Sequence, residues 1–339
     1  MTPSTIAADV SAAAPRTLRH LVGQPNVVAT LEIATRAYWN DHASGRSPSA
    51  GPFSFSGPSG TGKTLAARIL AAELGLADFK EALGQTFATP TDLHRWLLDS
   101  GANTALFIDE CATMNPAIQH ELLIAVDENR IMLPAAGPGR KSARIIPLEH
   151  PAFIFATTNP EDLLPALRSR MRVECHFDFY EVEALTIIIK QRADACHWRY
   201  ESEDILRDIA ARSRETPRLA MRILTAVWRV ARSEDAEVMT RAHLEVALRL
   251  ERIDAIGLDI WQRRYLLLLA EDGAGVEIRL GTIASTFGLP TKTIAHVVEP
   301  YLLRQRLISK TEKGRAITER GLRHLRGEPL VGNSIDEES

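Results

Sequence analysis

The sequence holds few cysteines, and they are scattered. Cys111, Cys175 and Cys196 are the only three, which argues against a disulfide framework and is typical of proteins kept in a reducing compartment. His176 and His197 each follow one of these cysteines. Neither pair has the close C-x-x-C spacing by which neighbouring ligands share a metal ion, so we interpret the cysteines as small buried thiols.

The sequence also lacks a strong net charge and a long apolar run. Its formal net charge is only -3, so a nucleic-acid partner would have to contact a local basic surface. The densest apolar run, residues 265–270, is far too short to span a bilayer, and we predict a cytoplasmic protein without a membrane segment. Residues 1–15 lack the basic start and apolar block of a signal peptide and are expected to be a disordered lead-in.

What is present is a pattern of short apolar runs that alternate with helical segments. The 339 residues are too many for one ordinary core, so two or three domains are expected. Apolar residues at helical spacing over 26–39 are followed by a loop rich in Gly, Ser and Pro at 44–52. Strands alternating with helices predict an α/β domain whose parallel sheet is covered on both faces. The predicted strands are 53–56, 104–108, 152–157 and 173–179.

After residue 180 the strand signals stop. Helices at 181–194, 203–212, 217–232 and 241–250 predict a small bundle. A helix at 259–270, a helix-turn-helix pattern at 279–304 and a hairpin around Lys313 and Gly314 follow. The predicted segments are therefore a lead-in 1–15, a sheet domain 16–180, a helical domain 181–254, a C-terminal domain 255–330 and an acidic tail 331–339.

The strongest motif is a phosphate-binding loop between a predicted strand and a predicted helix. Its glycines let backbone N–H groups turn inward toward phosphates, and the following helix adds the positive end of its dipole. Lys63 is expected to reach the β- and γ-phosphates of ATP, and Thr64 to hold Mg²⁺. The residues that fit G-x-x-x-x-G-K-[ST] are Gly57, Pro58, Ser59, Gly60, Thr61, Gly62, Lys63 and Thr64.

Polar groups also follow two other predicted strands, at the sheet edge where ligands bind in such folds. Asp109 is expected to bind Mg²⁺, and Glu110 to polarise the attacking water. An apolar run ending in Asp-Glu is commonplace alone but becomes specific after a phosphate-binding loop. Thr158 and Asn159 end the next run and are placed to hydrogen-bond that water or the γ-phosphate.

Arginines complete the predicted nucleotide site. Arg168 and Arg170 lie close together, and a guanidinium on a neighbouring subunit's γ-phosphate stabilises transition-state charge, worth roughly 10³-fold or more in rate. Pro217 and Arg218 open a helix of the predicted bundle, from which Arg218 is expected to contact the γ-phosphate. A finger acting in trans requires a ring or filament, so a homo-oligomer is expected.

The order of these motifs resembles that of the AAA+ ATPases, and several stretches resemble the RuvB family of Holliday-junction branch-migration ATPases. Residues 21–27, 178–180, 299–303 and 314–315 resemble family segments, and 214–218 resembles the family's R-G-T-P-R. The resemblance implies an AAA+ P-loop domain, a helical lid and a winged-helix domain that act on DNA as a hexameric ring. It also implies that Leu21, Val22 and Tyr180 enclose adenine, that Thr158 and Arg218 are sensors, and that Arg170 is the finger rather than Arg168.

The chain departs from the family pattern at several places. Ser59 replaces a proline in the loop, Cys111-Ala112 replace Ile-His after the acids, and Met171-Arg172 replace Phe-Gly after the finger. Residues 130–147 are rich in proline and glycine and replace the hairpin with which the family docks RuvA. Catalysis is expected to survive these changes. They leave open whether a RuvA-like protein or another DNA machine is the partner.

The C-terminal domain carries a local basic cluster. Wing strands are predicted at 308–311 and 316–318, and Lys310, Lys313 and Arg315 are the predicted DNA contacts. The second helix of the helix-turn-helix offers few base-reading side chains, so contact is expected to be independent of DNA sequence. Winged helices also serve as protein-interaction modules, and that alternative stays open.

Three functions fit these predictions. The first is a ring-shaped, ATP-driven DNA motor that moves four-way junctions. The second is an ATP-dependent switch or loader for another DNA machine, such as that of a mobile element. The third is a protein-remodelling ATPase whose winged helix binds another subunit. Activity on a four-way junction separates the first from the others, and retention on plain duplex DNA separates the first two from the third.

Overall fold

The computed structural model describes residues 14–46, 50–133, 144–271 and 275–328. By their contacts these residues form two compact units, one of residues up to 210 with 215–225, the other of 211–214 with everything from 226. The predicted lead-in and tail lie outside the described residues, apart from residues 14 and 15. Within the described ranges no helix has the length and apolar character needed to cross a bilayer.

The first unit is built on a five-stranded parallel sheet with the order β2-β3-β6-β1-β7. Its strands are β1 (Phe53–Ser56), β2 (Asp78–Leu83), β3 (Thr104–Asp109), β6 (Ala152–Thr157) and β7 (Val173–His176). The four predicted strands are confirmed, although β7 ends three residues earlier than the predicted 179. The edge strand β2 was not predicted, because its charged, half-exposed residues form no apolar run.

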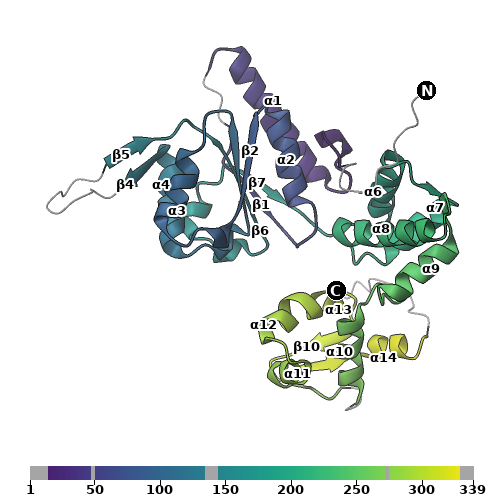
Figure 1. Cartoon of the computed structure of the whole chain (residues 1–339). Helices are drawn as coiled ribbons and strands as arrows, with labels where there is room; N and C mark the ends of the chain where they lie inside the picture. The colour runs from purple at the N-terminus through teal and green to yellow at the C-terminus, as the bar shows by residue number, and fades with distance from the viewer. Residues whose placement is uncertain (1–13, 47–49, 134–143, 272–274, 329–339) are drawn as a thin grey trace, which may run out of the picture. The chain divides into compact units, whose positions relative to one another are not determined.

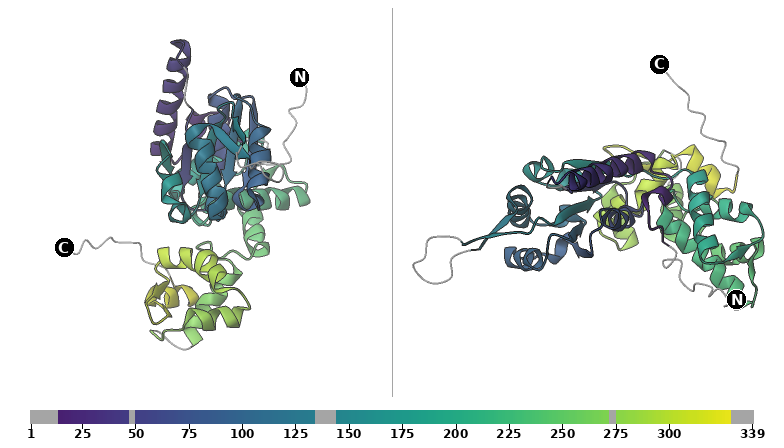
Figure 2. Two further views of the ribbon diagram at one scale, coloured as in Figure 1. Left: turned by 90° about the vertical axis from the view of Figure 1, so that its left-hand side faces the viewer. Right: turned by 90° about the horizontal axis from the view of Figure 1, so that it is seen from above.

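Helices cover both faces of this sheet (Figures 1 and 2). On one face, α1 (Pro25–Ala43) and α2 (Lys63–Glu73) share a core with Ala105 and Phe107 of β3. On the other, α3 (Pro90–Leu98) and α4 (Pro116–Glu128) pack on Leu106 and Ile108. Because successive residues of one strand enter opposite cores, the central strands are apolar throughout, as the sequence pattern predicted.

A two-stranded ribbon projects from the α3 and α4 side of the first unit (Figure 1). It consists of β4 (Arg130–Leu133) and β5 (Arg144–Pro147), which pair antiparallel with Ile131 opposite Ile146. Residues 130–147, the proline- and glycine-rich segment that stands in place of the family's docking hairpin, therefore include two paired arms, which were not among the predicted strands. Each arm is an arginine followed by consecutive apolar residues, a short run that the prolines and glycines between the arms obscured. Residues 134–143, which hold those prolines and glycines, lie outside the described residues.

Short elements connect the sheet to its helices, and beyond β7 the chain is mainly helical. The connectors are η2 (Leu18–His20), η3 (Gly84–Thr86), η4 (Cys111–Thr113), η5 (Pro160–Asp162) and α5 (Pro165–Arg168). The four predicted lid helices are confirmed as α6 (Val182–Ala195), α7 (Glu203–Ala211), α8 (Pro217–Ser233) and α9 (Arg241–Leu250), with β8 (Arg199–Tyr200) and β9 (Val238–Met239) between them. A reciprocal capping box between Thr240 and His243 fixes the start of α9.

The second unit contains a winged-helix fold. After α10 (Ile260–Glu271), the helix α11 (Leu280–Phe287) ends at Gly288, whose positive φ of 63° makes the predicted turn. A continuous helix follows, formed by α12 (Thr291–Thr293), the π-helical η6 (Ile294–Val298) and α13 (Glu299–Arg304). Pro300 has no N–H to continue the regular ladder, and the wide π turn precedes it. The wing is β10 (Ile308–Lys310) paired with β11 (Arg315–Ile317), before α14 (Glu319–Leu325).

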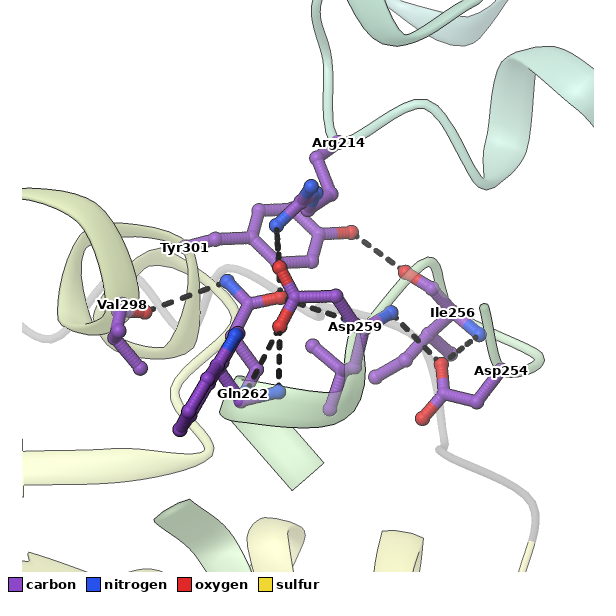
Figure 3. A network of polar contacts seen from close by, with 9 residues as sticks. Arg214, Asp254, Ile256, Asp259, Gln262, Val298 and Tyr301 are labelled. Atoms are coloured by element: carbon purple, nitrogen blue, oxygen red, sulfur yellow. Dashed lines mark hydrogen bonds and ion pairs between the residues drawn. The ribbon is translucent and has the colours of Figure 1, made fainter. Parts of the chain in front are cut away.

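A polar network within the second unit holds residue 214 to the start of α10 (Figure 3). The Arg214 guanidinium donates to Asp259 Oδ2 at 2.9 Å and to Gln262 Oε1 at 3.0 Å. Asp259 Oδ1 accepts from the backbone N–H groups of Trp261 and Gln262, which caps α10. Gln262 is buried, and its amide donates to the Val298 carbonyl. The network therefore ties α10 both to residue 214 and to the second helix of the helix-turn-helix.

Candidate functional site: a nucleotide cavity and a basic wing

The phosphate-binding loop lies between β1 and α2, as predicted. Gly57, Gly60 and Gly62 have φ values of 136°, 83° and 103°, which favour glycine. At Gly57 a Cβ atom would also collide with the Phe177 carbonyl. Thr61 is buried, and its hydroxyl donates to the Pro58 carbonyl at 2.8 Å, which closes the loop on itself.

Lys63 is buried beneath this loop. Its Nζ donates to the carbonyls of Gly57 at 2.7 Å and Pro58 at 2.9 Å. Burial lowers the pKa of the Lys63 ammonium, while the carboxylates of Glu110 and Asp109 oppose that shift. A cation held by two backbone carbonyls in this position can exchange them for phosphate oxygens when a nucleotide enters.

Oxygen ligands suited to Mg²⁺ meet at the end of β3. The Thr64 hydroxyl lies 3.2 Å from Asp109 Oδ2. A hydroxyl and a carboxylate side by side are the hard oxygen donors that Mg²⁺ takes beside bound phosphates, so these residues fit the ion. In the described part of the chain, no cluster of three or more His, Cys, Asp or Glu side chains could hold another metal.

Glu110 and Thr158 come together from adjacent strands. Glu110 has a φ of 48°, which turns the chain out of β3, and its Oε2 accepts a hydrogen bond from the Thr158 hydroxyl at 3.3 Å. Asn159 is instead the N-cap residue of η5, and its backbone N–H donates to the Thr157 hydroxyl. Neither Thr158 nor Asn159 is among the residues that line the cavity. The structure thus joins Thr158, but not the side chain of Asn159, to the predicted catalytic acid.

The two predicted arginines have different surroundings. Arg218 on α8 lines the cavity, donates to the Ser59 hydroxyl at 3.0 Å and has its backbone N–H on the Gly60 carbonyl. Arg170 is 46% exposed, lies outside the cavity wall and pairs with Asp127 of α4 at 2.8 Å. A finger intended for a neighbouring subunit has to be accessible, and the position of Arg170 is compatible with that prediction.

Apolar side chains close the end of the cavity at which adenine is predicted to lie. The predicted residues Leu21, Val22, Tyr180 and Pro217 line it. Tyr180 is buried, and its hydroxyl donates to the Thr61 carbonyl at 2.8 Å. A Cβ at Gly23 would lie 2.5 Å from the Tyr180 ring, so only glycine allows this approach. Burial raises the pKa of Tyr180 to about 12, so its hydroxyl stays a neutral donor.

The cavity measures about 260 Å³, and part of its wall was not predicted. The residues that sequence reasoning missed are Pro15, His20, Leu65, Ile188, Gln191, Arg192 and Met221. Ile188, Gln191 and Arg192 share one face of α6 by their spacing of three and four residues. That spacing was readable in the sequence, but which face of α6 meets the nucleotide depends on how the helix docks.

The cysteines are buried and free, as predicted. Burial raises the pKa of the Cys111 thiol to about 12, and the carboxylates of Glu110 and Asp109 act in the same direction. Burial also raises the pKa of Cys175 to about 12. Thiols with such pKa values are protonated and unreactive near neutrality, so Cys111 is a packing residue although it adjoins the predicted catalytic acid, Glu110.

The basic wing differs from its prediction at one residue. Lys310 and Lys313 are exposed, as a DNA contact requires. Arg315 is only 9% exposed, and its guanidinium forms a fork with Glu299, which is 1% exposed. Tyr265 donates to the same carboxylate at 2.7 Å. Arg315 therefore cannot also present its charge to a phosphate, and its prediction as a DNA contact is corrected to a structural role inside the winged helix.

Three family models together match nearly the whole chain. The model of the Holliday junction DNA helicase RuvB P-loop domain matches residues 13–177. The RuvB AAA lid domain matches 180–254, and the RuvB C-terminal winged helix domain matches 255–326. These matches confirm the predicted fold class of a P-loop sheet domain followed by a lid and a winged helix.

Individual relatives agree over the same length. The Holliday junction branch migration complex subunit RuvB of Paracoccus denitrificans (strain Pd 1222) is 35% identical over 312 residues, which cover 92% of this chain and 89% of that protein. The Thermotoga maritima RuvB Holliday junction branch migration motor matches with a TM-score of 0.79 and 28% identity, covering 94% of this chain and 99% of that one. A single-substitution mutant of the Thermotoga protein matches with a TM-score of 0.80 and the same identity and coverage.

Proposed function

Because the chain belongs to the RuvB family, we propose that it is an ATP-hydrolysing motor that drives branch migration of Holliday junctions in recombination and repair. The observation that carries this proposal is the joint presence of a complete P-loop site and a winged helix in one chain that matches the family from residue 13 to 326. A switch or loader for another DNA machine and a protein-remodelling ATPase are not favoured, because the full-length relatives are branch-migration proteins.

In the hydrolysis step, the adenosine of ATP lies between Leu21, Val22 and the lid, with the phosphates on the loop before α2. Lys63 leaves the carbonyls of Gly57 and Pro58 for the β- and γ-phosphates. Glu110, held by Thr158, orients the attacking water and accepts its proton. A bound Mg²⁺, held by Thr64 and Asp109, would neutralise charge on the phosphates.

Completion of the site requires a second copy of the chain. Arg170 does not reach the cavity of its own subunit, and we assign it to the γ-phosphate of a neighbour, which predicts a homo-oligomeric ring, a hexamer as in the family pattern. Arg218 contacts the loop of its own subunit and reports the γ-phosphate through α8. The proposed domains remain 16–180, 181–254 and 255–330.

The proposed substrate is DNA, contacted by Lys310 and Lys313 through phosphates and without sequence preference. A RuvA-like protein is the proposed partner for the ribbon of β4 and β5, where Ile145 is 53% exposed. The proposed location is the cytoplasm, where such a DNA substrate is found.

The test uses a synthetic four-way junction with one labelled strand. The chain with ATP and Mg²⁺, with and without a purified RuvA, should convert the junction into two duplexes, and Lys63→Ala should not. A plain duplex of the same length should be bound but yield no product. ATP hydrolysis and duplex binding without junction movement in either mixture would instead support the switch or loader.

A further inference from the structure

An exposed tryptophan of the winged helix contacts both a second aromatic ring and an arginine. Trp261, at the start of α10, keeps 39% of its surface exposed. Its ring centroid lies 5.9 Å from that of Phe287, the last residue of α11. The Arg264 guanidinium lies 5.4 Å from the centroids of both rings. We call these three residues the aromatic platform.

The aromatic platform is anchored to the core of the winged helix. The Phe287 ring also lies 6.1 Å from the ring of Tyr265, which is fully buried. Arg264 follows Trp261 by three residues on α10, the spacing that brings side chains of one helix together. The fold therefore holds the exposed Trp261 ring in place. Such a ring offers contact area to a ligand at a low entropic cost of ordering.

Positive charge on the aromatic platform has no carboxylate to neutralise it. Among the described residues, neither Arg264 nor its exposed neighbour Arg263 has an ion pair or a side-chain hydrogen bond. The nearest acid along the chain, Asp259, is already paired with Arg214 and caps α10. An anionic ligand can therefore form charge-assisted hydrogen bonds with both guanidinium groups.

An exposed ring beside free guanidinium donors matches the chemistry of a nucleotide whose base is not stacked in a helix. Nucleobases stack on aromatic rings and on guanidinium planes, and arginine binds the attached phosphates. An acidic peptide would use the charge but has no need of a flat ring. Intact duplex DNA offers phosphates, but its base faces are covered by neighbouring base pairs. The observations thus favour a single strand with unpaired bases.

We propose that the aromatic platform binds single-stranded DNA by stacking an unpaired base on Trp261, while Arg263 and Arg264 contact the adjoining phosphates. The site is distinct from the wing, where Lys310 and Lys313 are assigned to phosphates alone. Every base has a π face, so stacking adds affinity for unpaired DNA without sequence preference. The inference rests on the proposed function only in taking DNA as the ligand. A motor that moves a junction opens base pairs at the crossover, and this site can hold an opened base.

The first test measures binding of the full chain to labelled oligothymidylate and to a strand of equal length with abasic sites in place of the bases. Trp261→Leu keeps an apolar contact with Phe287 but removes the stacking ring. We expect its Kd for oligothymidylate to rise about tenfold, which corresponds to ~1.4 kcal/mol. Trp261→Tyr, which keeps an aromatic face, should recover most of the affinity. Trp39→Leu is the matched control, because Trp39 is 43% exposed on α1 of the first unit, and its Kd should stay unchanged.

The abasic strand separates stacking from a structural role. It offers only phosphates and sugars, so Trp261→Leu should bind it as the parent does, whereas a damaged winged helix would bind both strands more weakly. Equal losses on both strands would overturn the proposal, as would an unchanged Kd of Trp261→Leu for oligothymidylate. A parent that binds neither these strands nor duplex DNA would contradict the proposed function as well, a result distinct from a parent that binds DNA regardless of its bases.

The arginines are tested on the same two strands. Changing Arg263 and Arg264 together to Gln should weaken binding of both strands alike. The slope of log K against log salt should become shallower by about 0.7 for each lost phosphate contact on a single strand. Arg323→Gln is the control, because Arg323 is paired with Glu319. An unchanged slope in the double variant would overturn the assignment of these arginines to phosphates.

Fluorescence reports on Trp261 directly, because a base stacked on an indole quenches its emission. Trp261 is the only tryptophan in residues 255–330. Saturating oligothymidylate should quench the emission of the parent, and the abasic strand should not. Trp261→Phe keeps a ring at this position but should lose the quench. A quench of equal size in Trp261→Phe would place the stacked base on another tryptophan and overturn the proposal.

Discussion

The nucleotide cavity and the basic wing were both predicted from the sequence, but only in the cavity do the predicted residues lie as expected. In the cavity, Lys63, Thr64, Asp109 and Glu110 lie together with the contacts that their chemistry requires. In the wing, Lys313 is exposed but Arg315, two residues later, is buried against Glu299.

The difference lies in what specifies each residue. In the cavity, the backbone of the loop and the ends of parallel strands require particular residue types at particular positions. A sequence motif records those positions. In the wing only positive charge was counted, and charge does not reveal which face of a strand a residue occupies. Arg315 is buried because its guanidinium pairs with the buried carboxylate of Glu299, and the other residues of β11, Ala316 and Ile317, are buried as well.

The largest expected effect tests the cavity. Glu110→Gln removes the proton acceptor but keeps the size of the side chain, so ATP turnover should fall roughly 10²- to 10⁴-fold while ATP binding persists. Glu161→Gln, an exposed change on η5, is the control and should leave turnover unchanged. Steady-state turnover and an ATP titration measure the two quantities. Parental turnover in Glu110→Gln would contradict its assignment.

The next effect tests whether Arg315 and Lys313 differ as the structure indicates. Arg315→Gln leaves Glu299 buried without its cation, and the winged helix should lose about 3–5 kcal/mol of unfolding free energy. Lys313→Gln should leave stability within ~0.5 kcal/mol. Denaturant unfolding followed by the winged-helix tryptophan, Trp261, measures both. Equal stability of the two variants would remove the distinction between them.

A third effect concerns the exposed lysines of the wing. Changing both Lys310 and Lys313 to Gln should weaken DNA binding alike for unrelated sequences. The slope of log K against log salt should become shallower by about 0.9 for each lost phosphate contact. Lys190→Gln on the lid is the control. Unchanged affinity and slope in the double variant would indicate that the winged helix binds protein rather than DNA.

The smallest effect returns to backbone geometry beside the cavity. Glu215 has a φ of 62°, a conformation that costs a non-glycine residue about 1 kcal/mol, and it stands where the family's R-G-T-P-R has glycine. Glu215→Gly should therefore stabilise the protein by about that amount. Glu181→Gly, at an ordinary φ of −67°, should bring no gain. Urea unfolding compares the two, and destabilisation by Glu215→Gly would mean that the Glu215 side chain matters more than its backbone.

The sequence predicted most of the fold because periodicity is strong in its elements. It predicted the central strands and the lid helices, and it missed β2, whose alternating charges at the sheet edge leave no apolar run. It predicted the phosphate end of the cavity, where the residues are consecutive. It did not predict Ile188, Arg192 or Met221 on the cavity wall, because their role follows from how α6 and α8 dock. The arms of the ribbon at β4 and β5 were overlooked for a similar reason, since pairing between them is not local.

The central claim is that ATP is hydrolysed between subunits, with Glu110 from one chain and Arg170 from the next. Arg170→Ala and Glu110→Gln should each fold, bind ATP and be nearly inactive alone, since a finger supplies roughly 10³-fold or more in rate. After the subunits exchange, some interfaces in a mixture combine an intact Glu110 with an intact Arg170. The account predicts an ATPase rate well above the weighted sum of the two variants, highest near equal proportions. A rate that never exceeds that sum at any mixing ratio would contradict it.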